Sequence, residues 1–277
     1  MAEILDILKI RILVSFLAAS PKSCTVMGLS RALREEKHRI SRTMISLEEE
    51  GLLDRSNQRA PVLTKLGKEK AEMYNERVEL ALNYFRREGV EADAAKTDAY
   101  ICALRCSDDL MKMMAANDAC HRMKRDLQHL RSFRGDEICK RLPDGCYEFP
   151  FVIYREHVKD GKNISMANEG FAHPCTLYVD EQSGMIQLLV QKIEQKSGIT
   201  GKIMHGKVDK MEYFDSGQFI QAELIGDVMT FPAEALNFVN IGQGAGQMLH
   251  GSVLLKMRCS CGIAHMPEST AMFTMQI

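Results

Sequence analysis

The stretch Lys37-His38-Arg39-Ile40-Ser41-Arg42-Thr43-Met44-Ile45-Ser46-Leu47-Glu48-Glu49-Glu50-Gly51-Leu52-Leu53 decides how the N-terminal part of this chain folds. Its apolar residues Ile40, Met44 and Leu47 recur at the i, i+4, i+7 spacing of one helical face. The arginines and serines between them fall on the opposite face, and Gly51 is a typical residue at which a helix ends. A short helix of this kind fits the major groove of DNA, where arginine can bond a guanine edge and hydroxyl groups can reach phosphate.

The segments on either side of this helix complete a recognisable module. Residues 26–34 carry an apolar set at helical spacing, and residues 35–37 form a short turn between the two helices. Downstream, two short apolar runs flank the polar loop at 56–60, which predicts a β-hairpin. The order helix, turn, helix, β-hairpin predicts a winged helix-turn-helix that binds double-stranded DNA. The alternative is an ordinary amphipathic helix whose arginines meet only solvent.

The candidate DNA-contacting side chains come from the second helix, the hairpin and the start of the helix that follows. Those in the middle of the helix would read bases, and those in the hairpin would contact phosphate or the minor groove. The remainder would add contacts to the DNA backbone, unless some of them only solvate the surface. The candidates are Lys37, His38, Arg39, Ser41, Arg42, Thr43, Arg55, Asn57, Gln58, Arg59 and Lys65.

Charge is unevenly distributed along the 277 residues, although the net charge is only −1. Residues 1–72 hold 13 Lys+Arg against 10 Asp+Glu, which gives +3, whereas residues 141–277 hold 11 against 15, which gives −4. The positive end is the end with the predicted DNA-binding module. No apolar run reaches membrane-spanning length, and Ala2-Glu3 and Asp6 place acid where a signal peptide needs base. We therefore expect a cytoplasmic protein without membrane contact, whose nine cysteines are free thiols or ligands.

The remaining chain divides into a helical and a β-rich part. Residues 65–88 keep helical spacing, Asp93 and Ser107 are expected to cap two more helices, and the last of these runs toward Phe133. From about Asp144 the pattern changes to strands and turns, and the glycine-rich run at 242–246 is a loop without a nucleotide-binding context. We expect an α+β protein with a DNA-binding domain at 1–72, a helical dimerisation region at 73–140 and a β-rich sensor or interaction domain at 141–277. The alternative for the helical region is a bundle without a partner.

One group of residues in the β-rich part has metal-ligand spacing. Cys259-x-Cys261-x3-His265 could be part of a divalent-metal site that His173-x-Cys175 completes. However, Cys259 and Cys261 share strand parity with valine, leucine and methionine, which favours ordinary buried thiols. From the sequence, the protein could therefore bind a divalent metal at these residues or have no cofactor.

The run from Ser30 to Gly67, followed by residues 77–108, resembles the diphtheria-toxin-repressor-like family of iron- or manganese-dependent regulators. The matching pieces are Ser30-Arg31-Ala32-Leu33, Ile40-Ser41-Arg42-Thr43, Leu47-Glu48-Glu49-Glu50-Gly51-Leu52, Leu63-Thr64-Lys65-Leu66-Gly67 and, after the hairpin, Arg77-Val78-Glu79-Leu80-Ala81 and Gly89-Val90-Glu91. The resemblance implies a dimeric winged-helix regulator. It does not imply metal activation in this region, because the family's ligand positions correspond here to Arg77, Ala81, Lys96, Tyr100, Ala103 and Leu104.

The sequence thus predicts a homodimeric transcriptional regulator, acting as a repressor, whose C-terminal domain senses a small-molecule or metal effector. No nucleophile–base motif or phosphate-binding loop is present, so we do not expect an enzyme. Two other functions stay open: a protein-interaction scaffold that retains the winged helix, and a metal or redox sensor that uses the C-terminal cysteines and histidines. An enzyme in the C-terminal domain is the third and weakest hypothesis.

Overall fold

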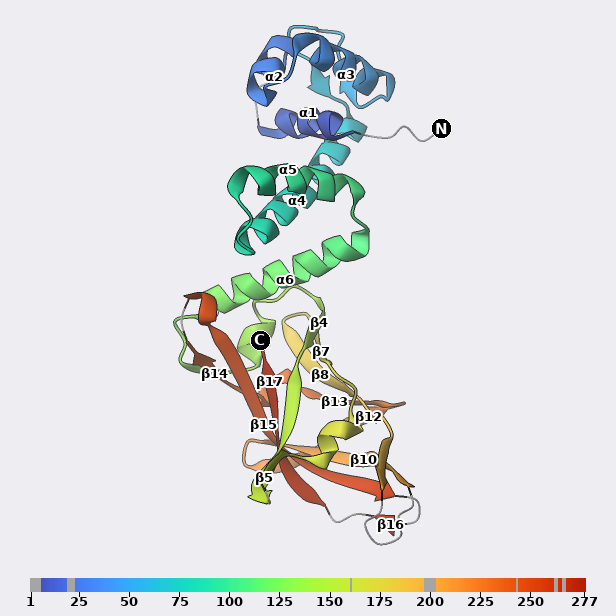
Figure 1. Ribbon diagram of the computed structural model, residues 1–277, viewed down its shortest axis with the longest axis vertical. Helices are drawn as coiled ribbons and strands as arrows, with labels where there is room; N and C mark the ends of the chain where they lie inside the picture. The colour runs from blue at the N-terminus through green and yellow to red at the C-terminus, as the bar shows by residue number, and fades with distance from the viewer. Residues whose placement is uncertain are drawn as a thin grey trace. The chain divides into compact units, whose positions relative to one another are not determined.

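A computed structural model describes residues 6–18, 23–159, 161–196, 203–242, 244–261, 264–265 and 268–277. The chain splits into two compact units, Met1–Asp118 and Ala119–Ile277. Helices form most of the first unit and strands form most of the second, so the α+β class is confirmed (Figure 1). The finer division at residues 72 and 140 stays a prediction. In the part of the chain that the structure describes, no helix is both long and apolar enough to cross a membrane.

The first unit contains the helices and the hairpin that the sequence predicts between residues 26 and 64. Helix α2 ends where Arg34 takes up the left-handed conformation, and a two-residue turn leads into the next helix. The elements are α1 (Ile7–Ala18), α2 (Val26–Leu33), α3 (Lys37–Glu49), β1 (Leu53–Asp54), β2 (Val62–Leu63), α4 (Lys65–Arg87), α5 (Ala92–Arg105) and α6 (Asp108–Leu127), the last of which contains the division between the units.

The apolar stripe of α3 is buried, as its spacing predicts. Ile40, Met44 and Leu47 are at most 1% exposed and belong to a core that also contains Ile12 and Leu13 of α1. With this stripe held against α1, the opposite side of α3 is left to solvent. The packing of α1 therefore decides which face of α3 is available to a partner.

A second core joins α4, α5 and α6 through Val78, Ala99 and Met111. Two details differ from the sequence prediction. The α5 cap is Glu91, whose carboxylate accepts the backbone N–H of Asp93, so Asp93 lies in the first turn instead. Helix α6 ends at Leu127, and Phe133 lies in a strand.

The second unit contains two antiparallel sheets, a short helix and three 3-10 turns among its described residues. Its elements are β3 (Ser132–Arg134), α7 (Asp136–Cys139), β4 (Gly145–Phe149), β5 (Phe151–Lys159), β6 (Lys162–Ile164), η2 (Met166–Gly170), β7 (Cys175–Asp180), β8 (Ser183–Leu189), β9 (Ile193–Lys196), β10 (Ile203–Asp215), β11 (Gln218–Gln221), β12 (Glu223–Ile225), β13 (Val228–Pro232), η3 (Ala233–Ala235), β14 (Asn237–Ile241), η4 (Gly244–Gly246), β15 (Met248–Cys261), β16 (Ala264–His265) and β17 (Ser269–Gln276).

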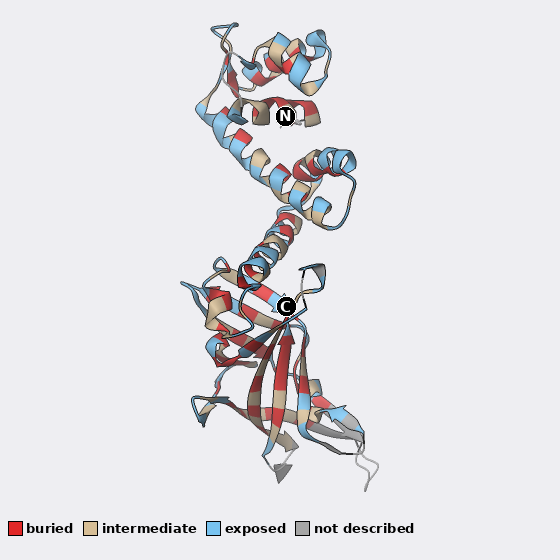
Figure 2. Cartoon of the chain, turned by 90° about the vertical axis from the view of Figure 1, so that its left-hand side faces the viewer, coloured by how far each residue is buried: buried red, intermediate tan, exposed pale blue. Residues whose placement is uncertain are grey.

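The two sheets pack face to face around aromatic side chains. The larger sheet has the order β11-β10-β15-β17-β5-β6, and the smaller has the order β12-β13-β8-β7-β4. Phe231 of β13 meets Phe273 of β17 edge to face, with 5.7 Å between ring centroids. Figure 2 shows buried residues along the long strands of this unit. Between β10 and β11 the chain turns at Ser216 and Gly217, both of which have positive φ.

Candidate nucleic-acid interface

The exposed face of α3 carries its positive charge in the first two turns. Lys37, His38, Arg39 and Arg42 are exposed there, whereas Ser41 and Thr43 are half-buried. The last turns carry Glu48 and Glu49 instead. A polyanion would therefore be attracted to the N-terminal half of α3, where the helix dipole also favours negative charge.

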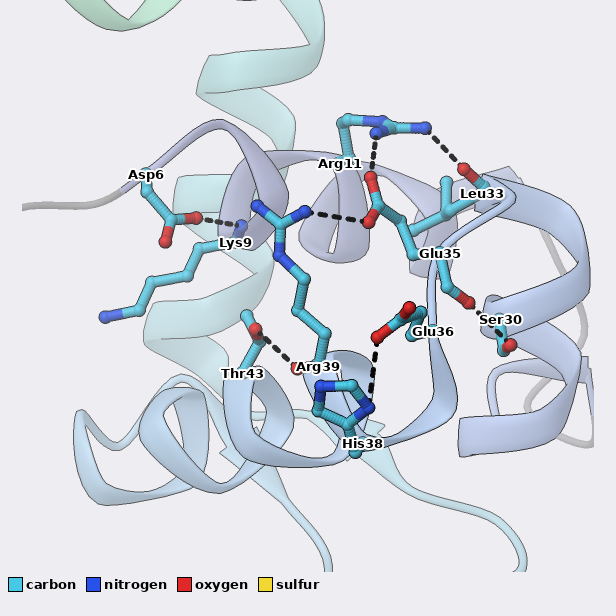
Figure 3. A network of polar contacts seen from close by, with 10 residues as sticks. All are labelled: Asp6, Lys9, Arg11, Ser30, Leu33, Glu35, Glu36, His38, Arg39 and Thr43. Carbon is cyan, nitrogen blue, oxygen red and sulfur yellow. Dashed lines mark hydrogen bonds and ion pairs between the residues drawn. The ribbon is translucent and has the colours of Figure 1, made fainter.

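Two of these residues are held by neighbouring carboxylates (Figure 3). Arg39 Nη1 lies 3.0 Å from Glu35 Oε2, and the other oxygen of Glu35 accepts Arg11 Nη1, also at 3.0 Å. His38 Nδ1 lies 3.2 Å from Glu36 Oε2. The Thr43 hydroxyl donates to the carbonyl of Arg39 at 2.9 Å. Among the described residues Lys37 and Arg42 have no such partner, so they are the free cations of α3.

Arg11 and Glu35 were not among the residues predicted to form the interface. They nevertheless position Arg39, because Arg11 also donates to the carbonyl of Leu33 at 2.8 Å and so fixes the Glu35 carboxylate next to α3. A sequence signal existed: Glu35 precedes Arg39 by four residues, the spacing of a helical ion pair. The link to Arg11 depends on tertiary packing and has no local signal.

In the hairpin, the structure separates Arg55 from the other candidates. The Arg55 side chain is only 11% exposed and pairs with Glu48 of α3 at 3.4 Å, so it connects the hairpin to the helix. Asn57, Gln58 and Arg59 are exposed, and the Asn57 side chain accepts the backbone N–H of Arg59 at 3.1 Å in a local turn. Arg59 is thus the hairpin cation that a phosphate can reach.

The junction between the hairpin and α4 fixes the last candidate, Lys65, at the first position of α4, where it is exposed. The Thr64 hydroxyl caps α4 by accepting the N–H of Gly67 at 3.0 Å, and it donates to the carbonyl of Gly51 at 2.6 Å. A Cβ on Gly67 would lie 1.8 Å from the carbonyl oxygen of Leu52, so only glycine fits there.

Arg77 is one of the positions at which the sequence resemblance would place a metal ligand, and its guanidinium is held there by oxygen acceptors. Arg77 on α4 donates to the carbonyls of Ala103 at 2.9 Å and Cys106 at 2.6 Å, and its Nη1 lies 2.6 Å from the carboxylate of Asp108. Carbonyl and carboxylate oxygens are suitable partners for a cation, and here the cation that they bind is the guanidinium group of Arg77. Within the described ranges no group of three or more His, Cys, Asp or Glu residues could hold a metal ion.

The C-terminal metal candidates are not brought together as one set. The buried thiol of Cys175 lies 3.6 Å from the sulfur of Met275, which pairs with Gly251 on β15. Cys259 is eight residues further along β15, a distance of about 26 Å at the usual rise per strand residue. Burial raises the pKa of Cys175 to about 12, which disfavours the thiolate that a metal requires. His173 stacks on Phe151 with 4.0 Å between ring centroids.

Cys259 is half-buried in β15 and pairs in register with Val208. The β15–β16 hairpin places the backbones of Cys261 and His265 nearby, but their side chains lie outside the described residues. Whether these three form a ligand group therefore stays a prediction. The parity argument holds as far as Met257, which is 2% exposed, and weakens at Cys259.

No protein-family profile matches the sequence, and no curated protein does either. Among solved structures, the chain is similar to the manganese regulator SloR, with 14% identity and a TM-score of 0.35 over 81% of this chain and 98% of that one. It is similar to IdeR of T. acidophilum, with 11% identity and a TM-score of 0.32 over 84% of this chain and 100% of that one. The NEAT5 domain of the B. anthracis hemophore IsdX2, in complex with heme, matches 48% of this chain and 96% of its own, with 14% identity and a TM-score of 0.29. These scores are too low to decide a function.

Proposed function

We propose that this chain is a DNA-binding transcriptional regulator whose residues 1–72 act as a winged helix-turn-helix. One observation carries the proposal. Lys37 and Arg42 on α3, Arg59 on the hairpin and Lys65 at the start of α4 are exposed and have no carboxylate partner among the described residues. The resemblance to diphtheria-toxin-repressor-like regulators in the same segment points the same way.

The roles of these cations follow from their positions. Arg42 lies in the middle of the exposed face of α3, where a guanidinium can bond the O6 and N7 atoms of guanine in the major groove. Lys37, Arg59 and Lys65 flank it and would contact phosphates, which fixes the orientation of the module without reading sequence. Ser41, Thr43, Asn57 and Gln58 remain candidates for additional polar contacts.

The experiment is a selection of bound duplexes from a random pool, followed by anisotropy measurements on the enriched site at several salt concentrations. We expect a motif with two related half-sites and an affinity that falls steeply with salt. The variant Lys37→Ala/Arg42→Ala/Arg59→Ala should lose binding. Its matched control is Lys96→Ala/Arg105→Ala/Lys112→Ala, which removes the same charge from α5 and α6 and should bind almost normally. Failure to enrich any motif would contradict the proposal.

We further propose that the chain works as a homodimer through the helices that follow the hairpin. Exposed large apolar side chains support this: Leu66 and Met73 lie two turns apart on α4, Ile101 lies on α5, and Met113 lies on α6. Sedimentation of the wild type should give a dimer, and Met73→Glu/Met113→Glu should shift it toward monomer. A monomeric wild type at micromolar concentration would exclude this part of the proposal.

The second candidate function is a protein-interaction scaffold. It is favoured by the neutralisation of Arg39 and Arg55 by Glu35 and Glu48, which lowers the charge available to DNA. The two functions differ in their response to the triple alanine variant of α3 and the hairpin. A regulator loses its action in cells with that variant, whereas a scaffold that binds through its apolar surface keeps it.

A further inference from the structure

The second unit contains a cavity of about 520 Å³. It lies where the last described part of β5, the start of β17 and the C-terminal part of β15 meet, since these antiparallel strands place Arg155, Ser269 and Met257 at the same end of the sheet. Its volume is in the range of small-molecule sites, and the end of a β-sandwich or barrel is a usual place for one.

Strand register shows that part of the cavity lining continues the core-facing side of the larger sheet. Arg155 pairs with Ala271, and Ala271 pairs with Leu255, so all three share the side of the sheet that buries Ile153 and Phe273. Because side chains alternate along a strand, the position two residues further toward this end of the sheet belongs to the same side on each strand. Those positions are His157, Ser269 and Met257, and the apolar core therefore gives way to a basic and sulfur-containing lining.

The short helix η2 covers this lining. Ser165 caps η2, and its backbone N–H donates to the carbonyl of Ile153 at 2.9 Å, while the Asn168 side chain accepts the N–H of Ile153 at 2.9 Å. Both bonds join η2 to β5. Met166 and Ala167 contribute to the cavity from this side. Two methionines thus line it, the half-buried Met166 and Met257 of β15, which is 2% exposed, and thioether side chains adapt to apolar groups of different shape.

The charges around the cavity leave one guanidinium free. The Arg155 Nε donates to the carbonyl of Ile164 at 3.2 Å, and no carboxylate partner of Arg155 occurs among the described residues. Of the two glutamates at the cavity, Glu156 has the opposite strand parity and Glu268 precedes β17, and each accepts a hydrogen bond or ion pair from another residue of the lining. Glu156 accepts the hydroxyl of Thr270, and Glu268 pairs with Lys256 at 2.9 Å. The core-facing part of the lining therefore presents the Arg155 guanidinium next to apolar side chains.

We propose that this cavity binds a hydrophobic carboxylic acid, with the carboxylate on the terminal nitrogens of Arg155 and the apolar body against Met166 and Met257. A guanidinium bonds a carboxylate through two parallel N–H groups, so it selects an organic acid over a neutral compound of the same shape. The flexible thioether side chains accept apolar bodies of different shape. The assignment goes beyond the proposed DNA binding and does not depend on it.

Calorimetric titration of the full chain tests this with three probe acids, 1-naphthoate, indole-3-acetate and decanoate, and with neutral 1-naphthamide. At least one acid should bind saturably at one site per chain, and Arg155→Gln should weaken it roughly tenfold, as the loss of a charge-assisted pair predicts. Arg258→Gln is the matched control, because Arg258 lies on the same sheet with the opposite parity and pairs with Asp209. It should leave affinity within about twofold of the wild type.

A second variant keeps the test independent of charge. Ser269 is exposed, so Ser269→Phe can fill the cavity without disturbing the core, and it should abolish binding while the circular dichroism spectrum stays that of the wild type. The proposal is overturned if none of the acids binds saturably, if 1-naphthamide binds as well as 1-naphthoate, or if Arg258→Gln weakens binding as much as Arg155→Gln. No DNA is present in the titration, so its outcome is separate from that of the proposed DNA binding.

Discussion

Inside the first unit, Lys9 and Arg77 have their charge neutralised by the protein itself, whereas Lys37 and Arg42 on the exposed face of α3 have no such partner among the described residues. The Lys9 side chain is 11% exposed and pairs with Glu50, whose side chain is 8% exposed. Arg77 is bound by two carbonyls and a carboxylate. The residue types are the same in the two regions. What differs is the number of acceptors that tertiary packing supplies, and this separates structural cations from cations available to a ligand.

The largest expected effect comes from breaking the interior pair. Lys9→Ala leaves the Glu50 carboxylate buried, with the Ser46 hydroxyl at 3.1 Å as its remaining partner among the described residues, and should lower the free energy of unfolding by about 3–5 kcal/mol. Urea denaturation followed by circular dichroism measures this. The double variant Lys9→Met/Glu50→Leu removes both charges and should recover most of the loss. A double variant as unstable as Lys9→Ala would mean that packing, and not the unpaired charge, is responsible.

The second effect concerns the junction of α4 and α5. Arg77→Ala removes three hydrogen bonds and leaves the carbonyls of Ala103 and Cys106 without that donor, so we expect a loss of about 2 kcal/mol in the same denaturation experiment. Asp108→Asn is the control, because the Asp108 side chain is 83% exposed and its pairing should contribute little. If the two variants lose equal stability, the carbonyl bonds of Arg77 do not stabilise the junction.

Some of these features could be predicted from the sequence, and others depend on tertiary contacts. The stripe of Ile40, Met44 and Leu47 predicted α3 and its buried side correctly, because helical periodicity is a local property. The burial of Arg55 was not predictable in this way, because its partner Glu48 is seven residues earlier, on another element. The separation of Cys175 from Cys259 required the register of β15 and β17, which no spacing along the chain specifies.

Arg42→Ala should have the opposite profile to that expected for Arg77→Ala, with little effect on stability and a large effect on DNA binding. Because Arg42 is exposed and without an ion-pair partner among the described residues, its loss should change the free energy of unfolding by less than about 0.5 kcal/mol. Affinity for the selected DNA site should fall by about 1–3 kcal/mol, with relaxed specificity at one base pair. Anisotropy with single-base variants of the site measures both. Arg55→Ala is the comparison on the hairpin, and it should affect stability more and base preference less.

The smallest expected effect comes from Glu35, which lies between the two kinds of cation. It holds Arg39, whose side chain is 61% exposed, and it is itself held by Arg11 (Figure 3). Glu35→Gln removes a negative charge beside the proposed phosphate-binding surface and releases Arg39. We therefore expect DNA affinity to rise a few-fold, with a salt dependence steeper by about one in the slope of log affinity against log salt.

Measuring DNA affinity also distinguishes two possible roles of the ion pair between Glu35 and Arg39. If Glu35 only withholds Arg39 from DNA, Arg39→Ala should have little effect in the wild type and should cancel the gain in the Glu35→Gln background. If Glu35 instead orients Arg39 toward a base, both single variants should weaken binding and the double variant should lose no more than either one. None of these variants changes Arg11 or the Leu33 carbonyl that it bonds at 2.8 Å, so the turn before α3 should stay in place, and differences in affinity would report on Arg39 itself.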